Sequence, residues 1–256
     1  MLRLPGPPAE LGPLRALVLA NLASFPTMGF RLMHKLLARQ KVACSRSQVR
    51  RLYQAMGILG KRPAPRARTT DSRHSHPRYP NLVWGLVAER PDQIWAADTL
   101  ELRVGGRRCF LALVEDLFTR RVVGHALSFV NDALLTLGAL EMALLVGTPE
   151  IHHSDQGSTY AAQAYVKRLS PGVALSMAGA GRAWENGFAE RLNRTFRDEE
   201  ISRSEYKTLR EARESIASYA KLYNERRLHM SLGYIPPMEA MEAYANDQLR
   251  GCESTL

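Results

Sequence analysis

The fold is decided by three apolar segments separated by short turns, QIWAADTLELRVGGRRCFLALVEDLFTRRVVGHAL (residues 93–127). Residues 94–104, 109–114 and 121–127 are each typical of a strand, and Gly105-Gly106 is a turn signal between the first two. Because both connections are short, the three strands are predicted to form an antiparallel meander. The middle strand is almost wholly apolar, as expected when helices cover both faces of a sheet.

Helices and strands are predicted to alternate after this meander. The order is a helix capped by Asn131 or Asp132, a strand at 149–153, a helix from Ser158 or Thr159, an edge strand at 173–175 and a helix over about 184–199. The final predicted helix begins with Thr208, with Glu211 three residues later as in a capping box. This order is similar to the ribonuclease-H-like α/β core, a mixed five-stranded sheet with flanking helices, here placed at residues 91–245 and followed by a tail at 246–256.

Residues 14–60 are predicted to form a small all-α module with one basic face. Two segments carry apolar residues at helical spacing, and the second can be capped by Ser45 or Ser47 and ended by Gly57. Such a pair indicates a helix-turn-helix-like DNA-binding module, although a plain helical hairpin with a solvated charged face explains the residues equally well. The apolar stripes are Phe30, Met33, Leu36, Leu37 and Val49, Leu52, Tyr53, Met56, and the candidate DNA contacts are Arg46, Arg50, Arg51 and Gln54.

Basic charge is concentrated in the first part of the chain. Residues 1–90 hold 16 Lys and Arg but 3 Asp and Glu, whereas the remaining residues hold 19 and 22. With a net charge of +10, this asymmetry favours an acidic polymer, double-stranded DNA, as partner.

Residues 1–13 are predicted to be disordered. Residues 61–90 are predicted to be a Pro- and Arg-rich linker that lies along phosphates through Arg62, Arg66 and Arg68.

Cysteine content and hydropathy favour a protein of the reducing cytoplasm. The three cysteines are widely spaced, which favours neither a disulfide framework nor a zinc site. No apolar run approaches the ~20 residues that span a bilayer, so no membrane partner is expected.

Three acidic residues carry the predicted chemistry. Asp98 lies in the first predicted strand, where a lone carboxylate is costly to bury unless it is paired or binds a metal. Asp155 follows the fourth strand, and open α/β sheets bind ligands outside the carboxyl ends of their strands. Glu190 shares a helix face with Arg194 and Arg197, which suits a boundary between metal and DNA phosphate.

Each acid also has an ordinary structural explanation. Asp98 could be a satisfied strand-end aspartate, Asp155 could cap a helix, and Glu190 could be exposed and paired with Arg194. Together, however, the three occupy the positions that this fold needs for a metal site. Carboxylates without His or Cys favour Mg²⁺ or Mn²⁺, and two ions are expected, one to activate the attacking oxygen and one to stabilise the leaving oxygen. His153 is expected to have a core or supporting role.

At these residues the chain resembles the bacterial insertion-sequence transposases whose catalytic core is shared with retroviral integrases, and in particular their second-reading-frame (OrfB-type) product. The resemblance runs from about Phe25 to Pro237 and rests on a combination of motifs. These are GFR (29–31), RPDQIW (90–95), DLFTRRVVG (116–124), HSDQGS (153–158), ENGFAE (185–190) and YNERRLH (223–229).

The resemblance implies a DDE transposase that cleaves DNA with divalent metal and joins strands by attack of a DNA 3′-hydroxyl. It implies a homo-oligomer on DNA, since element ends and target are handled together, and a location with the nucleoid in the bacterial cytoplasm. The family's catalytic and metal-binding triad carries over to Asp98, Asp155 and Glu190. The basic residue that follows this triad in the family carries over to Arg197. The motif that ends the family's core, whose role would be DNA contact or domain closure, carries over to Tyr223, Asn224, Arg227 and His229.

The chain departs from the family pattern at several positions. The last two acids are one residue closer together than usual, and Glu185-Asn186 stands where Asp-Asn is usual. Glu185 therefore competes with Glu190 as a ligand, although its helical register does not place it with Arg194 and Arg197. The upstream helix-turn-helix and leucine-zipper segment that such elements encode separately is not found in this sequence, so an upstream-frame partner or a frameshifted fusion is expected.

Two other functions are compatible with the sequence. A hydrolysis-only ribonuclease-H-like nuclease would have little use for the basic module and linker, and it would make no joined product. A catalytically silent DNA-binding relic or regulator of its own element would lose nothing on Asp155→Asn, but it would have no need of an intact triad.

Overall fold

The computed structural model describes residues 12–59, 77–169, 171–179 and 182–253. The chain divides into two compact units, one of residues 1–68 with 228–235 and one of residues 69–227 with 236–256. Arg62, Arg66 and Arg68, the predicted contacts of the linker, lie outside the described residues.

The first unit contains α1 (Gly12–Ser24), α2 (Phe30–Arg39) and α3 (Arg46–Ala55). Of the two candidate caps, Ser45 begins α3: its Oγ accepts a hydrogen bond from Gln48 N at 3.2 Å, and Gln48 Oε1 accepts one from Ser45 N at 2.7 Å. Gly57, with φ of +66°, follows the helix end. The predicted apolar stripes pack inward through the buried residues Met33, Leu36, Leu37, Val49, Leu52 and Tyr53.

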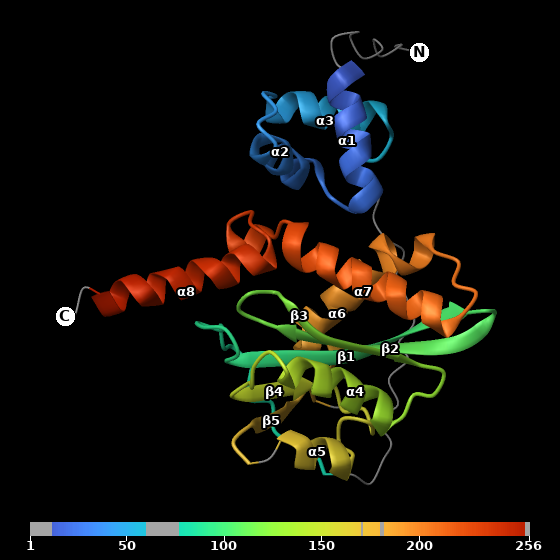
Figure 1. The fold of residues 1–256 in the computed structure, drawn as a ribbon, viewed down its shortest axis with the longest axis vertical. Helices are drawn as coiled ribbons and strands as arrows, with labels where there is room; N and C mark the ends of the chain where they lie inside the picture. The colour runs from blue at the N-terminus through green and yellow to red at the C-terminus, as the bar shows by residue number, and fades with distance from the viewer. Residues whose placement is uncertain (1–11, 60–76, 170, 180–181, 254–256) are drawn as a thin grey trace. The chain divides into compact units, whose positions relative to one another are not determined.

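The second unit is built on a five-stranded sheet of order β3-β2-β1-β4-β5, seen edge-on in Figure 1. The strands β1 (Ile94–Val104), β2 (Arg107–Asp116) and β3 (Val122–Ser128) form the predicted antiparallel meander. The turn residues Gly105 and Gly106 have φ of +55° and +76°, which explains the glycine pair. The strands β4 (Ile151–Ser154) and β5 (Ala174–Met177) run parallel to β1, so the sheet is mixed, as predicted.

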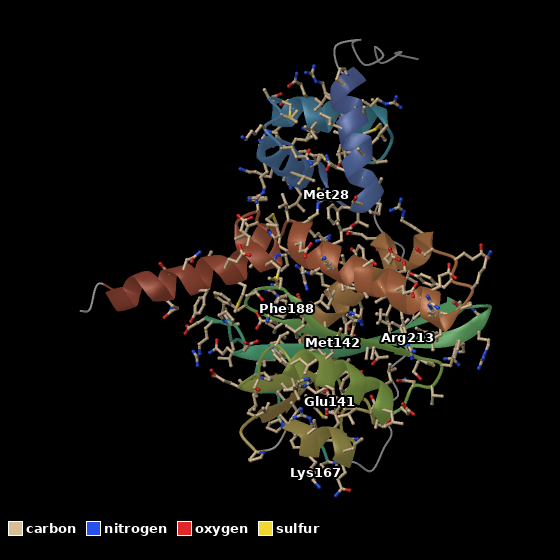
Figure 2. The ribbon with its side chains drawn as sticks, viewed as in Figure 1. Met28, Glu141, Met142, Lys167, Phe188 and Arg213 are labelled. Carbon is tan, nitrogen blue, oxygen red and sulfur yellow. The ribbon has the colours of Figure 1, made fainter. Side chains whose placement is uncertain are left out.

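Helices cover both faces of this sheet (Figure 1). One face packs against α4 (Ala133–Leu144) and α5 (Gln163–Leu169), and the other against α6 (Gly187–Glu199) and α7 (Leu209–Arg226). Side chains of α4 and α7 also reach β3; Met142 of α4 and Arg213 of α7 are labelled in Figure 2. Met142 Sδ accepts from His125 N at 3.3 Å, and Arg213 Nη2 donates to Leu127 O at 3.0 Å, so both helices are tied to β3.

Several helix boundaries differ from those predicted. Asp132 caps α4 by accepting from Leu135 N, but α5 begins at Gln163 because residues 157–162 form turns. A 3₁₀ turn (Ala183–Asn186) precedes α6. The helix α8 (Pro237–Glu253) was not predicted and extends into the expected tail, although Pro237 at its first position is a usual start signal. Among the described residues, no helix combines the length and apolar character needed to cross a membrane.

Candidate active site

The pairing of β1 with β4 brings two of the predicted acids together. These strands run parallel, and their last paired residues are Ala97 and Ser154. Asp98 and Asp155 each come directly after a member of that pair. Neighbouring strands lie about 4.8 Å apart, so the two aspartates are neighbours at the carboxyl end of β4.

The helix α6 brings the third acid to the same place. Asn193 is one helical turn beyond Glu190 on the same face, and its Nδ2 donates to Asp98 Oδ2 at 2.8 Å. One turn before Glu190, Asn186 Nδ2 donates to Ala97 O at 3.1 Å. The helix is therefore attached to β1 on both sides of Glu190, which is exposed at the start of α6.

The electrostatics of Asp98 reflect this convergence. Burial, together with the negative charges of Asp155 and, less strongly, Glu190, raises the pKa of Asp98 to about 8. Hydrogen bonds from Thr99 N, at 2.8 Å to Oδ1, and from Asn193 oppose that rise. The three acids predicted from the sequence thus share one electrostatic site.

The loop after β4 holds Asp155 in a defined position. Asp155 Oδ1 accepts from Gly157 N at 2.9 Å, which closes a local turn. A Cβ on Gly157 would lie 2.9 Å from that same oxygen, so a larger residue would displace the carboxylate. Because α5 begins only at Gln163, Asp155 is not its N-cap, which removes the ordinary explanation considered for it.

His153 supports the strand rather than facing the acids. Ser176 Oγ accepts from Leu82 N at 2.8 Å, so its hydroxyl proton is available to His153 Nδ1, also at 2.8 Å. Burial lowers the pKa of His153 to about 4, so the ring is neutral near pH 7. This agrees with the supporting role expected for it and ties β4 to β5 and to the chain at Leu82.

Glu185, the possible competitor of Glu190, is used elsewhere. Its Oε2 accepts from Gly179 N at 2.7 Å and from Asn81 Nδ2 at 2.9 Å, and its Oε1 accepts from Arg182 Nη1 at 3.3 Å. The backbone N–H of Gly179, followed by Asn81, lowers the pKa of Glu185. Asn81 belongs to the stretch assigned to the linker, and here it braces the segment before α6.

The donor set fits a hard divalent cation. Among the residues in the described ranges, no three His, Cys, Asp or Glu side chains form a ready-made metal cage. The charges of Asp155 and Glu190 nevertheless make a negative Asp98 unfavourable, and a cation would relieve that repulsion. Asn193 Oδ1, buried beside Asp98, has no hydrogen-bond partner in the described part of the chain. Carboxylate and amide oxygens are ligands that suit Mg²⁺.

The predicted DNA-contacting residues fall into separate groups. Arg46, Arg50, Arg51 and Gln54 are all exposed on α3, as a basic recognition face requires. On α6, Arg194 is exposed and Arg197 is partly buried. His229 lies in the short segment 228–235, where its backbone pairs with Ile235.

Arg227 does not fit the DNA contact considered for it. Its side chain is 14% exposed and pairs with the fully buried Glu199 of α6. Nη2 donates to Glu199 Oε1 at 2.8 Å and Nε donates to Oε2 at 3.0 Å, while Tyr219 OH donates to Oε2 at 2.6 Å. The guanidinium joins the ends of α6 and α7, an arrangement that suits domain closure, the other role considered for it, better than a DNA contact.

The sequence did not single out Asn193, although the structure places it on Asp98. The available signal was its spacing, three residues after Glu190 on one helix face. Asn186, which was noted only as part of the Glu185-Asn186 pair, is buried, and its side chain holds the backbone next to Asp98.

Comparison with protein families agrees with this architecture. Two models described as integrase core domain match residues 88–183 and 171–237, and one described as HTH-like domain matches residues 17–66. The last match confirms the helix-turn-helix-like prediction for the first unit.

Related proteins match over most of the chain. The transposase for insertion sequence element IS629 of Shigella sonnei is 34% identical over 86% of this chain and 77% of its own length. An uncharacterized 31 kDa protein of insertion element IS600, also from Shigella sonnei, is 31% identical over 88% of this chain and 85% of its own. The putative transposase of IS986/IS6110 from Mycobacterium tuberculosis is 27% identical, with 87% and 84% covered.

A solved structure shares the fold. A chain of the simian T-cell lymphotropic virus intasome, in complex with PP2A regulatory subunit B56 gamma, matches with a TM-score of 0.54 and 17% identity over 81% of this chain and 73% of that one. With the sheet order, the paired aspartates and the extent of the sequence relationship, these findings place the chain in the family of insertion-sequence transposases with an integrase core domain.

Proposed function

We propose that the chain is a DDE-type polynucleotidyl transferase that cleaves and joins DNA strands during transposition of an insertion sequence. The observation that carries the proposal is the placement of Asp98, Asp155 and Glu190 by β1, the end of β4 and α6. Three acids from distant parts of the chain are brought to one point, although their mutual repulsion is unfavourable. Such an arrangement is typical of sites that gain their stability from bound metal.

In this proposal the three carboxylates hold Mg²⁺ or Mn²⁺, two ions in all. When bound, the ions supply activation of the attacking oxygen and stabilisation of the leaving oxygen in an in-line displacement. Asn193 orients Asp98 through its hydrogen bond to Oδ2, and Gly157 N orients Asp155. The exposed Arg194, one turn beyond Glu190, is positioned to pair with a DNA phosphate.

The substrate is double-stranded DNA, both element ends and target. The exposed basic residues of α3 are proposed to contact one DNA segment while the carboxylates act on another. Because two ends must be joined to one target, we propose a homo-oligomer assembled on DNA, with an upstream-frame partner or fusion for end recognition. Its place of action is the nucleoid of a bacterial cytoplasm.

The test is an in vitro joining assay with DNA that carries the sequence flanking this gene. The wild type is compared with Asp155→Asn in Mg²⁺ or Mn²⁺, with Asp247→Asn, an exposed residue of α8, as the matched control. Joined product from the wild type and the control, but not from Asp155→Asn, is the expected result. DNA affinity should be unchanged in all three proteins.

Other results would point to the two alternatives. Cleavage that depends on Asp155 but yields no joined product, even with the upstream-frame partner added, would identify a hydrolytic nuclease. Equal behaviour of wild type and Asp155→Asn, with DNA binding intact, would identify a catalytically silent binder. Asp98→Asn and Glu190→Gln should repeat the loss, and retained activity in either would remove that residue from the triad.

A further inference from the structure

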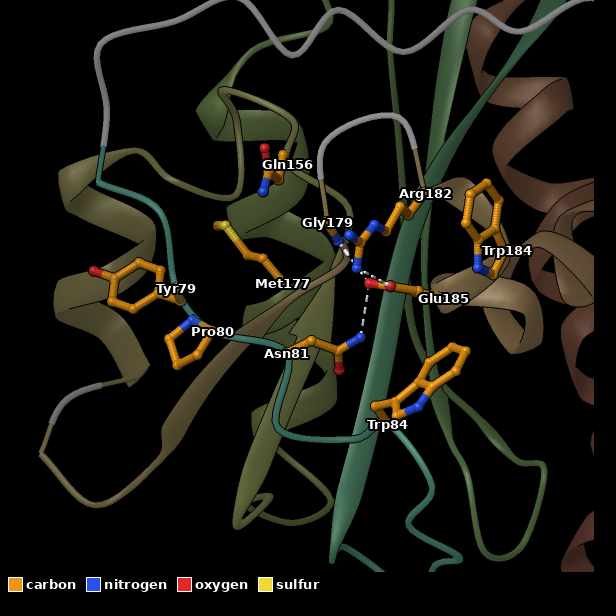
Figure 3. Close-up of a pocket in the computed structure, with 10 residues that line it drawn as sticks. All are labelled: Tyr79, Pro80, Asn81, Trp84, Gln156, Met177, Gly179, Arg182, Trp184 and Glu185. Carbon is orange, nitrogen blue, oxygen red and sulfur yellow. Dashed lines mark hydrogen bonds and ion pairs between the residues drawn. The ribbon is translucent and has the colours of Figure 1, made fainter.

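A cavity of about 700 Å³ opens in the second unit next to the loop that carries Asp155. It is formed by the chain before β1, by the end of β5 and by the segment before α6 (Figure 3). Its lining residues are Tyr79, Pro80, Asn81, Trp84, Gln156, Met177, Gly179, Arg182, Trp184 and Glu185. The triad does not use this cavity.

Two exposed tryptophans dominate its rim. Trp84 is 68% exposed and Trp184 is 60% exposed, whereas the remaining tryptophan, Trp95, is fully buried. Indole rings carry a large apolar area, and a protein that leaves two of them at one cavity mouth presents flat surfaces for a ligand. In Figure 3 the two rings lie on either side of the Glu185 side chain.

Hydrogen bonds hold the walls of this cavity in place. The carboxylate of Glu185 binds Gly179 N, Asn81 Nδ2 and Arg182 Nη1, drawn as dashed lines in Figure 3. Met177 N donates to Pro80 O at 3.3 Å, which fixes the chain before β1 against β5. The segments that carry Trp84 and Trp184 are thus joined by charge-assisted contacts, so the backbone that bears the two rings is already in place before a ligand binds.

The cavity is connected to the triad at two points. Gln156 lines it and directly follows Asp155. Asn186 directly follows the lining residue Glu185 and donates to Ala97 O, next to Asp98. A DNA strand whose phosphodiester reaches the carboxylates therefore has its adjoining nucleotide within reach of the cavity.

We propose that this cavity binds an unpaired nucleobase of the DNA end, stacked against Trp84 and Trp184. Inside a duplex both faces of a base are covered by its neighbours, and at a fully paired end one face is still covered, so a base that stacks on both indoles must be unpaired. Arg182, whose side chain is 63% exposed on the same rim, supplies positive charge for the adjoining phosphate. The inference rests on the proposed function, because it names the part of the DNA that lies next to the triad.

The test measures binding without catalysis, in the absence of divalent metal. The probe is a short duplex with an unpaired 3′ end that contains 2-aminopurine, whose fluorescence falls on stacking, compared with the same duplex fully paired. Wild type should prefer the unpaired end and quench the probe. Trp84→Ala and Trp184→Ala should each weaken binding of the unpaired end about tenfold, with little effect on the paired duplex.

Matched variants separate stacking from other effects. Leu145→Ala removes a side chain that is 86% exposed just after the end of α4 and that does not line the cavity, so this variant should bind like wild type. Trp184→Phe should recover most of the affinity that Trp184→Ala loses, because it keeps an aromatic face. Circular dichroism melting of each variant checks that the fold is retained.

The pocket proposal is overturned if folded Trp84→Ala and Trp184→Ala keep the wild-type preference and quenching. It is also overturned if the wild type shows no preference for the unpaired end. Failure of the proposed function is a different result, since it would appear as a wild type that does not cleave or join in metal while its binding of the unpaired end stays intact.

Discussion

Replacing Arg227 by methionine should destabilise the second unit strongly. The change keeps an apolar stem of similar length but removes the guanidinium from Glu199, which is fully buried. Two charge-assisted hydrogen bonds are lost, at 2.8 and 3.0 Å, while the hydrogen bond from Tyr219 OH, a neutral donor, remains. Removing one partner of a buried ion pair in this way lowers the free energy of unfolding by about 3–5 kcal/mol.

The assay can report on the second unit alone. All three tryptophans of the chain, Trp84, Trp95 and Trp184, lie in residues 69–227, so urea unfolding followed by tryptophan fluorescence does not register the helical module. The matched control is Arg210→Met, which breaks the exposed pair with Glu214 on the same helix. It should change the free energy of unfolding by less than about 0.5 kcal/mol.

A double variant and a binding measurement complete the test. Arg227→Met combined with Glu199→Met should recover most of the lost stability, because no charge is then left buried. DNA affinity of folded Arg227→Met should keep its dependence on salt. A loss below about 1 kcal/mol, together with a salt slope reduced by about one, would refute the packing role and favour a DNA contact for Arg227.

Three further predictions follow from particular side chains. Gly124→Ala should cost about 1–3 kcal/mol in urea unfolding, because a Cβ on β3 would overlap the carbonyl oxygen of Ala139 in α4; an unchanged midpoint would contradict that packing. Burial raises the pKa of Glu115 from 4.5 to about 8 in the folded protein. Between these two values the unfolded chain loses its proton more readily than the folded one, so the wild type should lose stability as pH rises from about 4.5 to 8. Glu115→Gln should remove the part of that loss that comes from Glu115, being more stable than wild type by a few kcal/mol at pH 8 and nearly equal to it at pH 4.5. The same pH dependence of stability in both proteins would be inconsistent with the shift. Arg50→Ala and Arg51→Ala should each weaken DNA binding and lower the salt slope by about one, and unchanged slopes would exclude the exposed face of α3 as the DNA contact.

Much of the fold was predictable because its signals are local. Gly105-Gly106, the cap at Ser45 and the apolar strands 94–104 and 109–114 each depend on neighbours within a few residues. Helix boundaries were less accurate where two local signals competed. Ser158 and Thr159 looked like caps, but the turn that begins at Asp155 delays α5 to Gln163.

The sequence by itself determined the order of the strands along the chain and the basic face of α3, and it supplied the three acidic residues proposed for the metal site, since residue type and spacing carry that information. Only the tertiary structure decided which side chains meet. The parallel pairing of β1 with β4 places Asp98 beside Asp155, and the packing of α6 adds Asn193 to that site. Burial likewise makes Arg227, for which a DNA contact or domain closure was considered, the partner of Glu199. Such contacts join residues far apart in the chain, and they depend on register and desolvation, which no local pattern of residues encodes.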